Sequence, residues 1–427
     1  MGFQQGLSGL NAASKSLEAT GNNVANANTV GFKSSQAQFA DVYASSLSGG
    51  GGGSTQVGIG VKVSTVAQSF SQGNVTASNN PLDLAINGGG FFRMDTNGSI
   101  AYSRNGQFSL DKNGSIVNAN GAHLTGYTAN ANGVLSTGAP GNLVLSTADQ
   151  PPKQTATVNA VLNLDSNKPV IDSTTKPFKV SDPTTYTNAT SVSVYDSLGV
   201  PHVLQTFYVK TGPVPPPAGT PATGGNGTWD VYAAVDDVLL PAPPGGKIGT
   251  LSFKSDGSID TTAVPKPFDA IINVSSGAAT PFTVQIDYTG TTQYGSVFSV
   301  NAIKQDGFAS GRLAGFNTGA DGVITGRYTN GKSTVLGQVV LANFPSLNGL
   351  KPLGDNLWAE SSASGQPLVA PPGSGSLGVL QSSAVEDSNV DLTAELVNLI
   401  TAQRFYQANA QTIKTQDQVL QTLVNLR

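Results

Sequence analysis

The sequence predicts a mainly β, multi-domain protein with coiled-coil-like α-helical termini and two β-domains of short antiparallel strands. The chain has 51 Gly and 24 Pro in 427 residues, yet residues 379–427 contain neither. Because both residue types interrupt helices, this favours a long C-terminal helix. Apolar residues recur every seventh position near both ends, which also predicts helices. The region between them shows alternating apolar residues and Asn-Gly pairs, the pattern of short strands.

Residues 1–30 are predicted to form an amphipathic helix. Gly6, Gly9 and Gly21 weaken this helix, each by roughly 1 kcal/mol relative to Ala. We therefore expect the helix to require a packing partner. Its apolar side comprises Phe3, Leu7, Leu10, Leu17 and Val24.

Residues 31–70 are predicted to be an extended or flexible linker region. The run 48–54 includes five consecutive glycines, which favours a flexible joint. Beyond it, Val57, Ile59, Val61 and Val63 alternate as in a half-buried strand.

An inner, discontinuous β-domain is expected from two segments, 71–147 and 296–375. The first contains Asn-Gly pairs at 97–98, 105–106, 113–114 and 120–121. Because these residue types tolerate positive φ, the pairs favour tight hairpins. Residues 148–295, between the two segments, are predicted to be an outer β-domain with an exposed Pro- and Gly-rich loop.

Residues 385–427 are expected to form the C-terminal helix, which pairs with 1–30 as an inner tube domain. Ser388 and Asp391 have the spacing of a capping box, and Glu395 adds negative charge near the helix N-terminus. The seven-residue stripe is Leu392, Leu399, Tyr406, Ile413 and Leu420. The second seam is mixed and comprises Leu396, Gln403, Ala410, Asp417 and Val424.

The sequence allows two packing arrangements for these terminal helices. They could fold on each other as an intramolecular hairpin, or they could pack against other subunits. We favour the second arrangement because the body of the chain has β cores of its own. Helices with a mixed seam are marginal alone in water, so we expect them to order on assembly.

Composition excludes several classes of function. The net charge of −4 and the absence of a basic run argue against nucleic acid as a partner. No stretch approaches the roughly 20 apolar residues of a membrane span, so no membrane insertion is expected. Cysteine is absent, which removes disulfides and thiolate sites. The N-terminus lacks the pattern of a cleavable secretory signal, and composition alone favours a cytoplasmic protein.

No catalytic, cofactor-binding or metal site is expected. Loops beginning at Asp95 and Asp111 resemble the opening of a calcium loop but lack its later ligands, so we interpret them as turns. His123 and His202 lie far apart without neighbours at ligand spacing. A glycosidase could hide two carboxylates in a β-domain, but no such pair stands out.

Both ends of the chain resemble a known family. Residues 7–13 and 21–33 are similar to the N-terminal motif of bacterial flagellar rod and hook proteins. Residues 390–397, 402–413 and 420–425 are similar to their C-terminal motif. Segments 82–88, 305–311, 336–344 and 356–360 look like hook proteins in particular. The N-terminal motif residues are Asn22, Asn23, Asn26, Asn28, Gly31, Phe32 and Lys33, and the family often has Thr where Val30 stands.

The resemblance implies a helical homopolymer that forms a curved, flexible tube. This tube would act as a universal joint between rod and filament and carry an export channel. The implied partners are distal-rod, hook-cap and hook–filament junction proteins and the flagellar type III export apparatus. Export by that apparatus implies an extracellular location, which replaces the cytoplasmic expectation.

Some alternatives stay open. A distal-rod protein of the same family is the main one, although the large central insertion favours a hook protein. A secreted β-rich adhesin would share the low charge but would not need matched heptads at both ends. The Asn cluster at 22–28 is interpreted as a helix end and folded junction. The many amides of the C-terminal helix are either ordinary solvated residues or an uncharged channel wall past which exported chains slide.

Overall fold

The computed structural model describes residues 2–42, 58–146, 148–212, 227–241, 245–262 and 267–425. The predicted Gly-rich joint at 48–54, Val57 and most of the Pro-rich loop lie outside these ranges. The chain divides into two compact units. The first comprises residues 1–147, 314–327 and 333–427, and the second comprises 148–313 and 328–332.

The second unit contains two five-stranded sheets within its described residues. The first sheet has the order β17–β18–β11–β19, with β20 antiparallel to β11. The second has the order β12–β13–β14–β15, with β16 paired to β14. The strands are β11 (Thr157–Asp165), β12 (Asn188–Tyr195), β13 (Pro201–Lys210), β14 (Thr228–Val235), β15 (Val238–Leu239), β16 (Lys247–Ser252), β17 (Phe268–Ile272), β18 (Phe282–Asp287), β19 (Thr292–Tyr294) and β20 (Ser299–Gln305).

One apolar core joins these two sheets. In β17, Phe268, Ala270 and Ile272 are buried while Asp269 and Ile271 are exposed, as expected for a strand with one face inward. The buried residues of both sheets form a single cluster that includes Leu162, Leu204, Trp229, Leu251 and Val284. The unit is therefore a β-sandwich.

The first unit contains the inner β-domain, in which two distant chain segments pair. β9 pairs with β23, β5 with β24 and β6 with β26, all antiparallel. The strands of the first segment are β3 (Val75–Ala77), β4 (Leu84–Asn87), β5 (Phe91–Thr96), β6 (Ser99–Ser103), β7 (Ser109–Leu110), β8 (Ile116–Val117), β9 (His123–Thr128) and β10 (Gly141–Asn142). Those of the second are β21 (Leu313–Thr318), β22 (Val323–Tyr328), β23 (Ser333–Val339), β24 (Leu341–Asn343), β25 (Lys351–Gly354), β26 (Leu357–Ala359), β27 (Leu368–Ala370), β28 (Val379–Ser382) and β29 (Ala384–Glu386).

The predicted Asn-Gly turns form at three of the four pairs. Gly98, Gly114 and Gly121 have φ of 89°, 81° and 78° and lie between consecutive strands. The pair at 105–106 is different, and the hairpin predicted there is wrong. Gly106 lies against the backbone of Leu84, whose N donates to Gly106 O (2.9 Å), and a Cβ would collide with Leu84 O. This glycine permits a close approach between chain segments and makes no turn.

Two α-helices lie at the chain ends, α1 (Gly2–Ala25) and α2 (Leu392–Asn425). α2 begins directly after Asp391, whose Oδ1 accepts bonds from Thr393 N (2.9 Å) and Ala394 N (3.1 Å). The N-cap is therefore Asp391, and the capping box expected from Ser388 does not form. Ser388 Oγ instead accepts from Val390 N (3.3 Å), because it lies before the helix.

Part of the predicted linker 31–70 is a β-hairpin and not a flexible segment. β1 (Ser35–Val42) and β2 (Gly60–Gln68) pair antiparallel along their whole length, with an irregularity between Gln38 and Phe39. The hairpin packs on α1. Sequence patterning predicted a strand at residues 57–63, which overlaps β2. It missed β1 and the pairing because β1 has few apolar residues, and because much of the hairpin's contact is with a helix and not with a sheet.

The predicted fold class is confirmed: the chain is mainly β, with helical termini and separate β-domains of mostly antiparallel strands. Exceptions among the described strands are β18 and β19, which both pair parallel with β11. The boundary of the second unit differs from the expected 148–295. β20 joins this unit because it pairs with β11, so the unit extends to residue 313.

Candidate functional site

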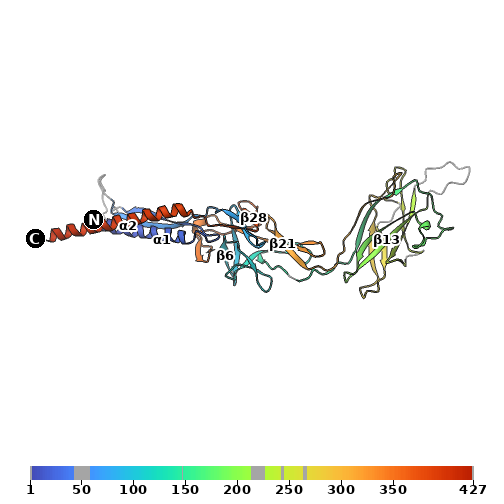
Figure 1. Cartoon of the computed structure of the whole chain (residues 1–427), viewed down its shortest axis with the longest axis horizontal. Helices are drawn as coiled ribbons and strands as arrows, with labels where there is room; N and C mark the ends of the chain where they lie inside the picture. The colour runs from blue at the N-terminus through green and yellow to red at the C-terminus, as the bar shows by residue number, and fades with distance from the viewer. Residues whose placement is uncertain are drawn as a thin grey trace. The chain divides into compact units, whose positions relative to one another are not determined.

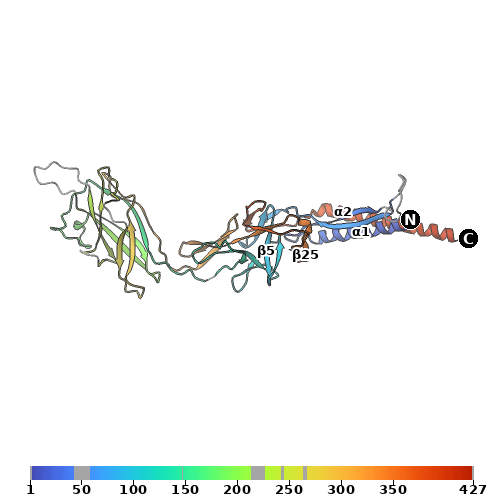
Figure 2. The same cartoon turned by 180° about the vertical axis from the view of Figure 1, so that it is seen from behind.

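The two terminal helices form an antiparallel pair within one chain. A Cβ built on Gly6 would lie 2.9 Å from Ile413 Cγ1, and one on Gly9 would lie 2.5 Å from Asn409 Oδ1. At the other end of the pair, Asn23 Nδ2 donates to Glu395 Oε1 (3.1 Å). Figures 1 and 2 show α1 and α2 side by side in opposite views. The intramolecular pairing, the less favoured of the two arrangements expected from sequence, is therefore present.

Small and polar residues of α1 lie at this contact. Gly6, Ala13, Thr20 and Asn23 are buried, whereas Leu10, Leu17 and Val24 of the predicted stripe are half-buried. Phe3 and Leu7 are 47% and 45% exposed. Gly6 and Gly9, which weaken an isolated helix, thus allow α2 to approach closely, a role that was not predicted for them from sequence.

The seam of α2 also differs from the predicted one. Of the seven-residue stripe, Leu399 and Ile413 are half-buried, and the more exposed members are Leu392, Tyr406 and Leu420. A second row of more buried residues is Glu395, Ala402, Asn409 and Gln416. Of the second seam expected from sequence, Ala410 is half-buried, whereas Leu396, Gln403, Asp417 and Val424 are exposed. Leu396 is 46% exposed and Val424 is 74% exposed. α2 packs against α1 with the side that carries Ala402, because a small residue there allows the two helices to lie close together.

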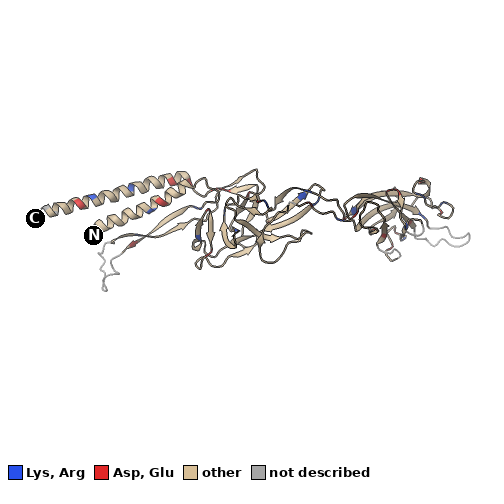
Figure 3. Cartoon of the chain, turned by 90° about the horizontal axis from the view of Figure 1, so that it is seen from below, with Lys and Arg blue, Asp and Glu red and all other residues tan. Residues whose placement is uncertain are grey.

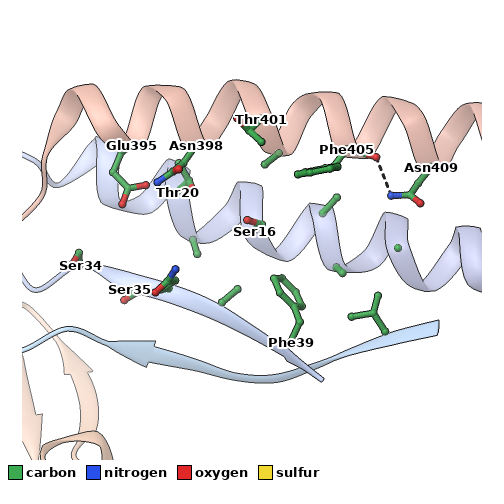
Figure 4. A pocket seen from close by; sticks show the side chains of 18 of the residues that line it. Ser16, Thr20, Ser34, Ser35, Phe39, Glu395, Asn398, Thr401, Phe405 and Asn409 are labelled. Atoms are coloured by element: carbon green, nitrogen blue, oxygen red, sulfur yellow. Dashed lines mark hydrogen bonds between the residues drawn. The ribbon is translucent and has the colours of Figure 1, made fainter. Parts of the chain in front are cut away.

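Helices α1 and α2 and the β1–β2 hairpin surround a groove of about 770 Å³. Figure 4 shows Ser16 of α1, Phe39 of β1 and Phe405 of α2 around it. Among the described residues that line it, Glu395 is the one ionisable residue, and its carboxylate already binds Asn23. The lining is mainly small, amide and aromatic, so the groove is suited to packing against chain and not to acid–base chemistry.

The predicted motif 22–33 forms the junction between α1 and the β-structure. Asn23 Nδ2 donates to Ser35 O and Asn23 Oδ1 accepts from Ser35 N, each at 2.8 Å. Asn26 Nδ2 donates to Asn22 O (3.0 Å) and Oδ1 (2.6 Å), which secures the end of the helix. Asn28 is exposed and Phe32 is half-buried.

Gly31 is at the tightest point of this junction. Its φ is +72°, a left-handed conformation that favours glycine, and a Cβ would lie 2.5 Å from Asn105 N. Its N donates to Glu386 O (2.7 Å). Gly31 therefore allows the N-terminal motif to cross the inner domain next to β29.

A buried ion cluster lies beside Gly31. Lys33 Nζ is 2.6 Å from Glu386 Oε1, and Arg104 Nε is 3.1 Å from Glu386 Oε2. Lys33 Nζ also donates to Ser71 O (2.7 Å), and Gly73 N donates to Glu386 Oε1 (2.9 Å). The side chains of Lys33 and Glu386 are fully buried, and that of Arg104 is 4% exposed.

Burial controls the electrostatics of this cluster. It lowers the pKa of Lys33 below its ordinary value, although the Glu386 carboxylate acts in the opposite direction. It also lowers the pKa of Arg104, again against the effect of Glu386. Arg104 remains charged because its ordinary pKa is far above neutrality. One carboxylate therefore faces two buried cations.

Asn389 completes the junction just before α2. Its Nδ2 donates to Ser69 O (2.8 Å), and its Oδ1 accepts from Ser34 N (2.8 Å). Lys33 was predicted as part of the motif, whereas Arg104, Glu386 and Asn389 were missed. A usable signal was that charged residues are only 11% of this chain, so each one near a motif is informative.

Charge and metal-ligand chemistry are sparse elsewhere. Figure 3 shows isolated charged residues along α1 and α2, without a block of one sign. Within the described residues, no group of three His, Cys, Asp or Glu residues could hold a metal ion, and no helix is long and apolar enough to span a membrane. Asp95 and Asp111 accept bonds from backbone N–H groups of their own loops, as expected for turns.

Four family models match this chain, over residues 3–33, 85–308 and 381–426 taken together. Residues 3–33 match the model described as "Flagella basal body rod protein", and 85–197 match "Flagellar hook protein FlgE/F/G D1 domain". Residues 163–308 match "Flagellar basal body protein FlaE D2 domain", and 381–426 match "Flagellar basal body rod FlgEFG protein C-terminal".

Individual relatives agree with these models. The flagellar hook protein FlgE of Salmonella typhimurium is 41% identical over 434 residues, which covers 100% of both chains. That of Borreliella burgdorferi is 30% identical and covers 99% of this chain and 98% of the relative. A crystal structure of Helicobacter pylori flagellar hook protein FlgE2 has a TM-score of 0.54 at 13% identity; the match covers 73% of this chain and 100% of that one, and shows a shared fold. On the full-length sequence identity, the chain belongs to the flagellar hook protein FlgE family.

Proposed function

We propose that this chain, a structural subunit of the bacterial flagellar hook, polymerises through the outward faces of α1 and α2. The resulting tube is curved and flexible, acts as a universal joint between rod and filament, and carries an export channel. The observation that supports this most is the apolar surface left on the helix pair.

That surface includes residues of the predicted polymerisation stripe. Phe3 and Leu7 of α1 and Leu396, Leu420 and Val424 of α2 are between 45% and 74% exposed in the single chain. Large apolar patches on a soluble chain usually mark interaction sites. Since small residues serve the contact within the chain, the large apolar ones remain for neighbouring subunits.

Leu10, Leu17, Val24, Leu399 and Ile413 are half-buried in the single chain. Tyr406 remains 38% exposed and Leu392 47% exposed. These residues therefore serve both contacts, with one part of each side chain against the partner helix and another part available to a neighbour. A two-sided helix pair is suited to a tube wall, in which each pair has neighbours on both sides.

The junction transmits force between the helix pair and the inner β-domain. The buried contacts of Lys33 and Arg104 with Glu386 connect three chain segments without exposed, salt-screened ion pairs. Flexibility then belongs to the contacts between subunits. The low charge of the β-domains favours sliding there, because few ion pairs must break as the hook rotates.

The proteins expected to contact this subunit follow from the same role. A hook subunit meets distal-rod proteins at one end of the hook and hook–filament junction proteins at the other, and hook-cap proteins during growth. It reaches the extracellular hook through the flagellar type III export apparatus. The role is structural, and no catalysis is proposed.

Truncation after Asp391 tests this proposal. The shortened chain keeps Glu386 and Asn389, so the junction and both β-units should retain their fold while the tube-forming helix is lost. We expect a soluble monomer by light scattering and electron microscopy, at concentrations where the full chain forms tubes. Tubes formed by the truncated chain would overturn the proposal, and straight tubes of the full chain would favour a distal-rod role.

A further inference from the structure

A second group of charged residues lies in the β-sandwich unit, where the proposed polymerisation does not use it. His202 of β13 is only 8% exposed. Its Nδ1 lies 2.7 Å from Asp236 Oδ2, and its Nε2 lies 3.4 Å from Asp196 Oδ2. Both ring nitrogens of one buried histidine thus face carboxylate oxygens.

The two aspartates belong to different turns of the sandwich. Asp196 follows β12, and its Oδ1 accepts bonds from Leu198 N and Val200 N, both at 2.9 Å. Asp236 follows β14 with φ of 49°, and its Oδ1 accepts from Val203 N (2.9 Å). Asp196 therefore fixes its own turn with one oxygen, whereas Asp236 binds the neighbouring strand β13 with one oxygen. Each carboxylate faces the imidazole with its other oxygen.

A third segment joins the same carboxylate. Ser276, in the segment between β17 and β18, donates its hydroxyl to Asp196 Oδ2 (2.6 Å). Asp237 is next to Asp236 but accepts from Gln205 Nε2 (3.0 Å) and does not contact the ring. The charged groups that contact the ring are therefore Asp196 and Asp236, from the two turns.

The protonation state of His202 determines how many hydrogen bonds its ring can donate to these carboxylates. An ionised carboxylate can only accept hydrogen bonds, so a ring nitrogen that binds one must carry a proton. A neutral imidazole has one N–H, and its other nitrogen would then present a lone pair to a carboxylate oxygen. Both ring nitrogens can donate to the two carboxylates only when the ring is the doubly protonated imidazolium.

We propose that Asp196, His202 and Asp236 form a pH-sensitive latch that holds the turns after β12 and β14 together while His202 is protonated. Loss of the proton removes one of the two bonds and frees one turn from the other. Leu198 in the first turn is 57% exposed, and Val238, which begins β15 directly after the second turn, is 70% exposed, so the latch also controls how these apolar side chains are presented.

The direction of the histidine titration agrees with this geometry. Burial lowers the pKa of His202, but the bonds to Asp236 and Asp196 outweigh it and raise the pKa above its ordinary value. The added stability is therefore complete below about pH 6.5 and is lost as the pH rises through the raised pKa.

The experiment uses the two tryptophans of the full-length chain. Trp229 is fully buried in the sandwich core, and Trp358 belongs to the other unit. In a W358F background, Trp229 fluorescence therefore reports urea unfolding of the sandwich unit. Between about pH 6 and about pH 9 we expect the urea midpoint to fall, and we expect H202Q to remove most of that fall. H123Q, in the other unit, is the matched control and should leave the fall unchanged.

Histidine titration by NMR on ¹³C-labelled full-length chain provides a second readout. H202Q assigns the signal by removing it, and the expected pKa is above about 6.5. D236N keeps the ring and Asp196 but should move this pKa back toward its ordinary value, so the test does not depend on H202Q folding. The latch would be overturned by a pKa of His202 at or below the ordinary value, or by an unchanged pKa in D236N. It would also be overturned if the urea midpoint of H202Q fell between about pH 6 and about pH 9 as much as that of the parent.

Discussion

Lys33 Nζ lies 2.6 Å from Glu386 Oε1 with both side chains fully buried, although the two residues are 353 positions apart in the sequence. The contact brings the segment after α1 to the segment before α2, next to the inner sheet. Arg104 binds the other oxygen of the same carboxylate at 3.1 Å. The junction therefore depends on one anion that is shared by two buried cations.

Removing that anion should cost more than removing either cation. E386Q leaves Lys33 and Arg104 buried without a counter-charge, and we expect a loss of about 3–5 kcal/mol in the free energy of unfolding. K33M leaves the pair of Arg104 and Glu386 balanced, so its loss should be smaller. Urea unfolding followed by Trp358 fluorescence in a W229F background measures both. E18Q, which breaks an exposed pair with Lys15, is the control and should change stability by less than about 1 kcal/mol. Equal losses of stability in E386Q and E18Q would show that the buried ion cluster does not stabilise the junction.

The glycines of α1 should respond differently to alanine. A Cβ added at Gly21 would meet no neighbouring atom within 4 Å, so G21A should stabilise the helix by roughly 1 kcal/mol. In G6A the new Cβ would lie 2.9 Å from Ile413 Cγ1, which forces the helices apart and offsets that gain. Hydrogen exchange of α1 amides in the full chain distinguishes the two variants. Equal protection in both would show that close approach at Gly6 does not matter.

Acid should destabilise the sandwich unit through Asp196. Burial raises the pKa of this carboxyl, but bonds from Ser276, Val200 N and His202 outweigh it and lower the pKa below its ordinary value. The stability it contributes is therefore present above about pH 3.8 and is lost as the pH falls through the lowered pKa. Trp229 fluorescence in the W358F background should show the loss, and D196N should be less stable near neutrality and less sensitive to acid. An acid response as steep in D196N as in the parent would contradict this assignment.

Positive charge on the outward amides of α2 should slow export through the tube. Gln403, Gln407 and Gln411 are all exposed in the single chain, as a channel wall requires. We expect Q403K/Q407K/Q411K to form hooks but to lower secretion of later flagellar proteins, because lysines capture acidic stretches of passing chains. Q107K, at an exposed amide of the inner β-domain, is the control. Secretion equal to that of the control would favour the simpler interpretation of the amides as solvated residues.

Much of the fold could be predicted because it depends on local patterns. The absence of Gly and Pro after residue 378 predicted the C-terminal helix, and the alternating apolar residues and Asn-Gly pairs of the central region predicted short strands. Asn-Gly turns were correct where the pair lies between two strands, as at Asn97 and Gly98. At Gly106 the prediction was wrong because a distant segment, at Leu84, determines the need for glycine there.

The site was less predictable for the same reason. An apolar heptad shows that a helix has an apolar face suited to packing, but it does not show which partner will cover that face. The covered face is instead the one with Gly6 and Ala13, because close approach selects small residues. The ion pairs of Glu386 with Lys33 and Arg104 depend on contacts among three separated segments, which no local spacing reveals.

The central claim is that the outward apolar residues of α1 and α2 hold hook subunits together. Electron microscopy of F3S/L7S/L396S/L420S, at concentrations where the parent chain forms tubes, tests it most directly. The matched control V134S/V297S/L368S removes equally exposed apolar residues from the β-units, where exposures are 62%, 78% and 57%. We expect monomers of normal helix content for the helix variant and tubes for the control. Tubes of the helix variant at the parent's concentration would contradict the claim.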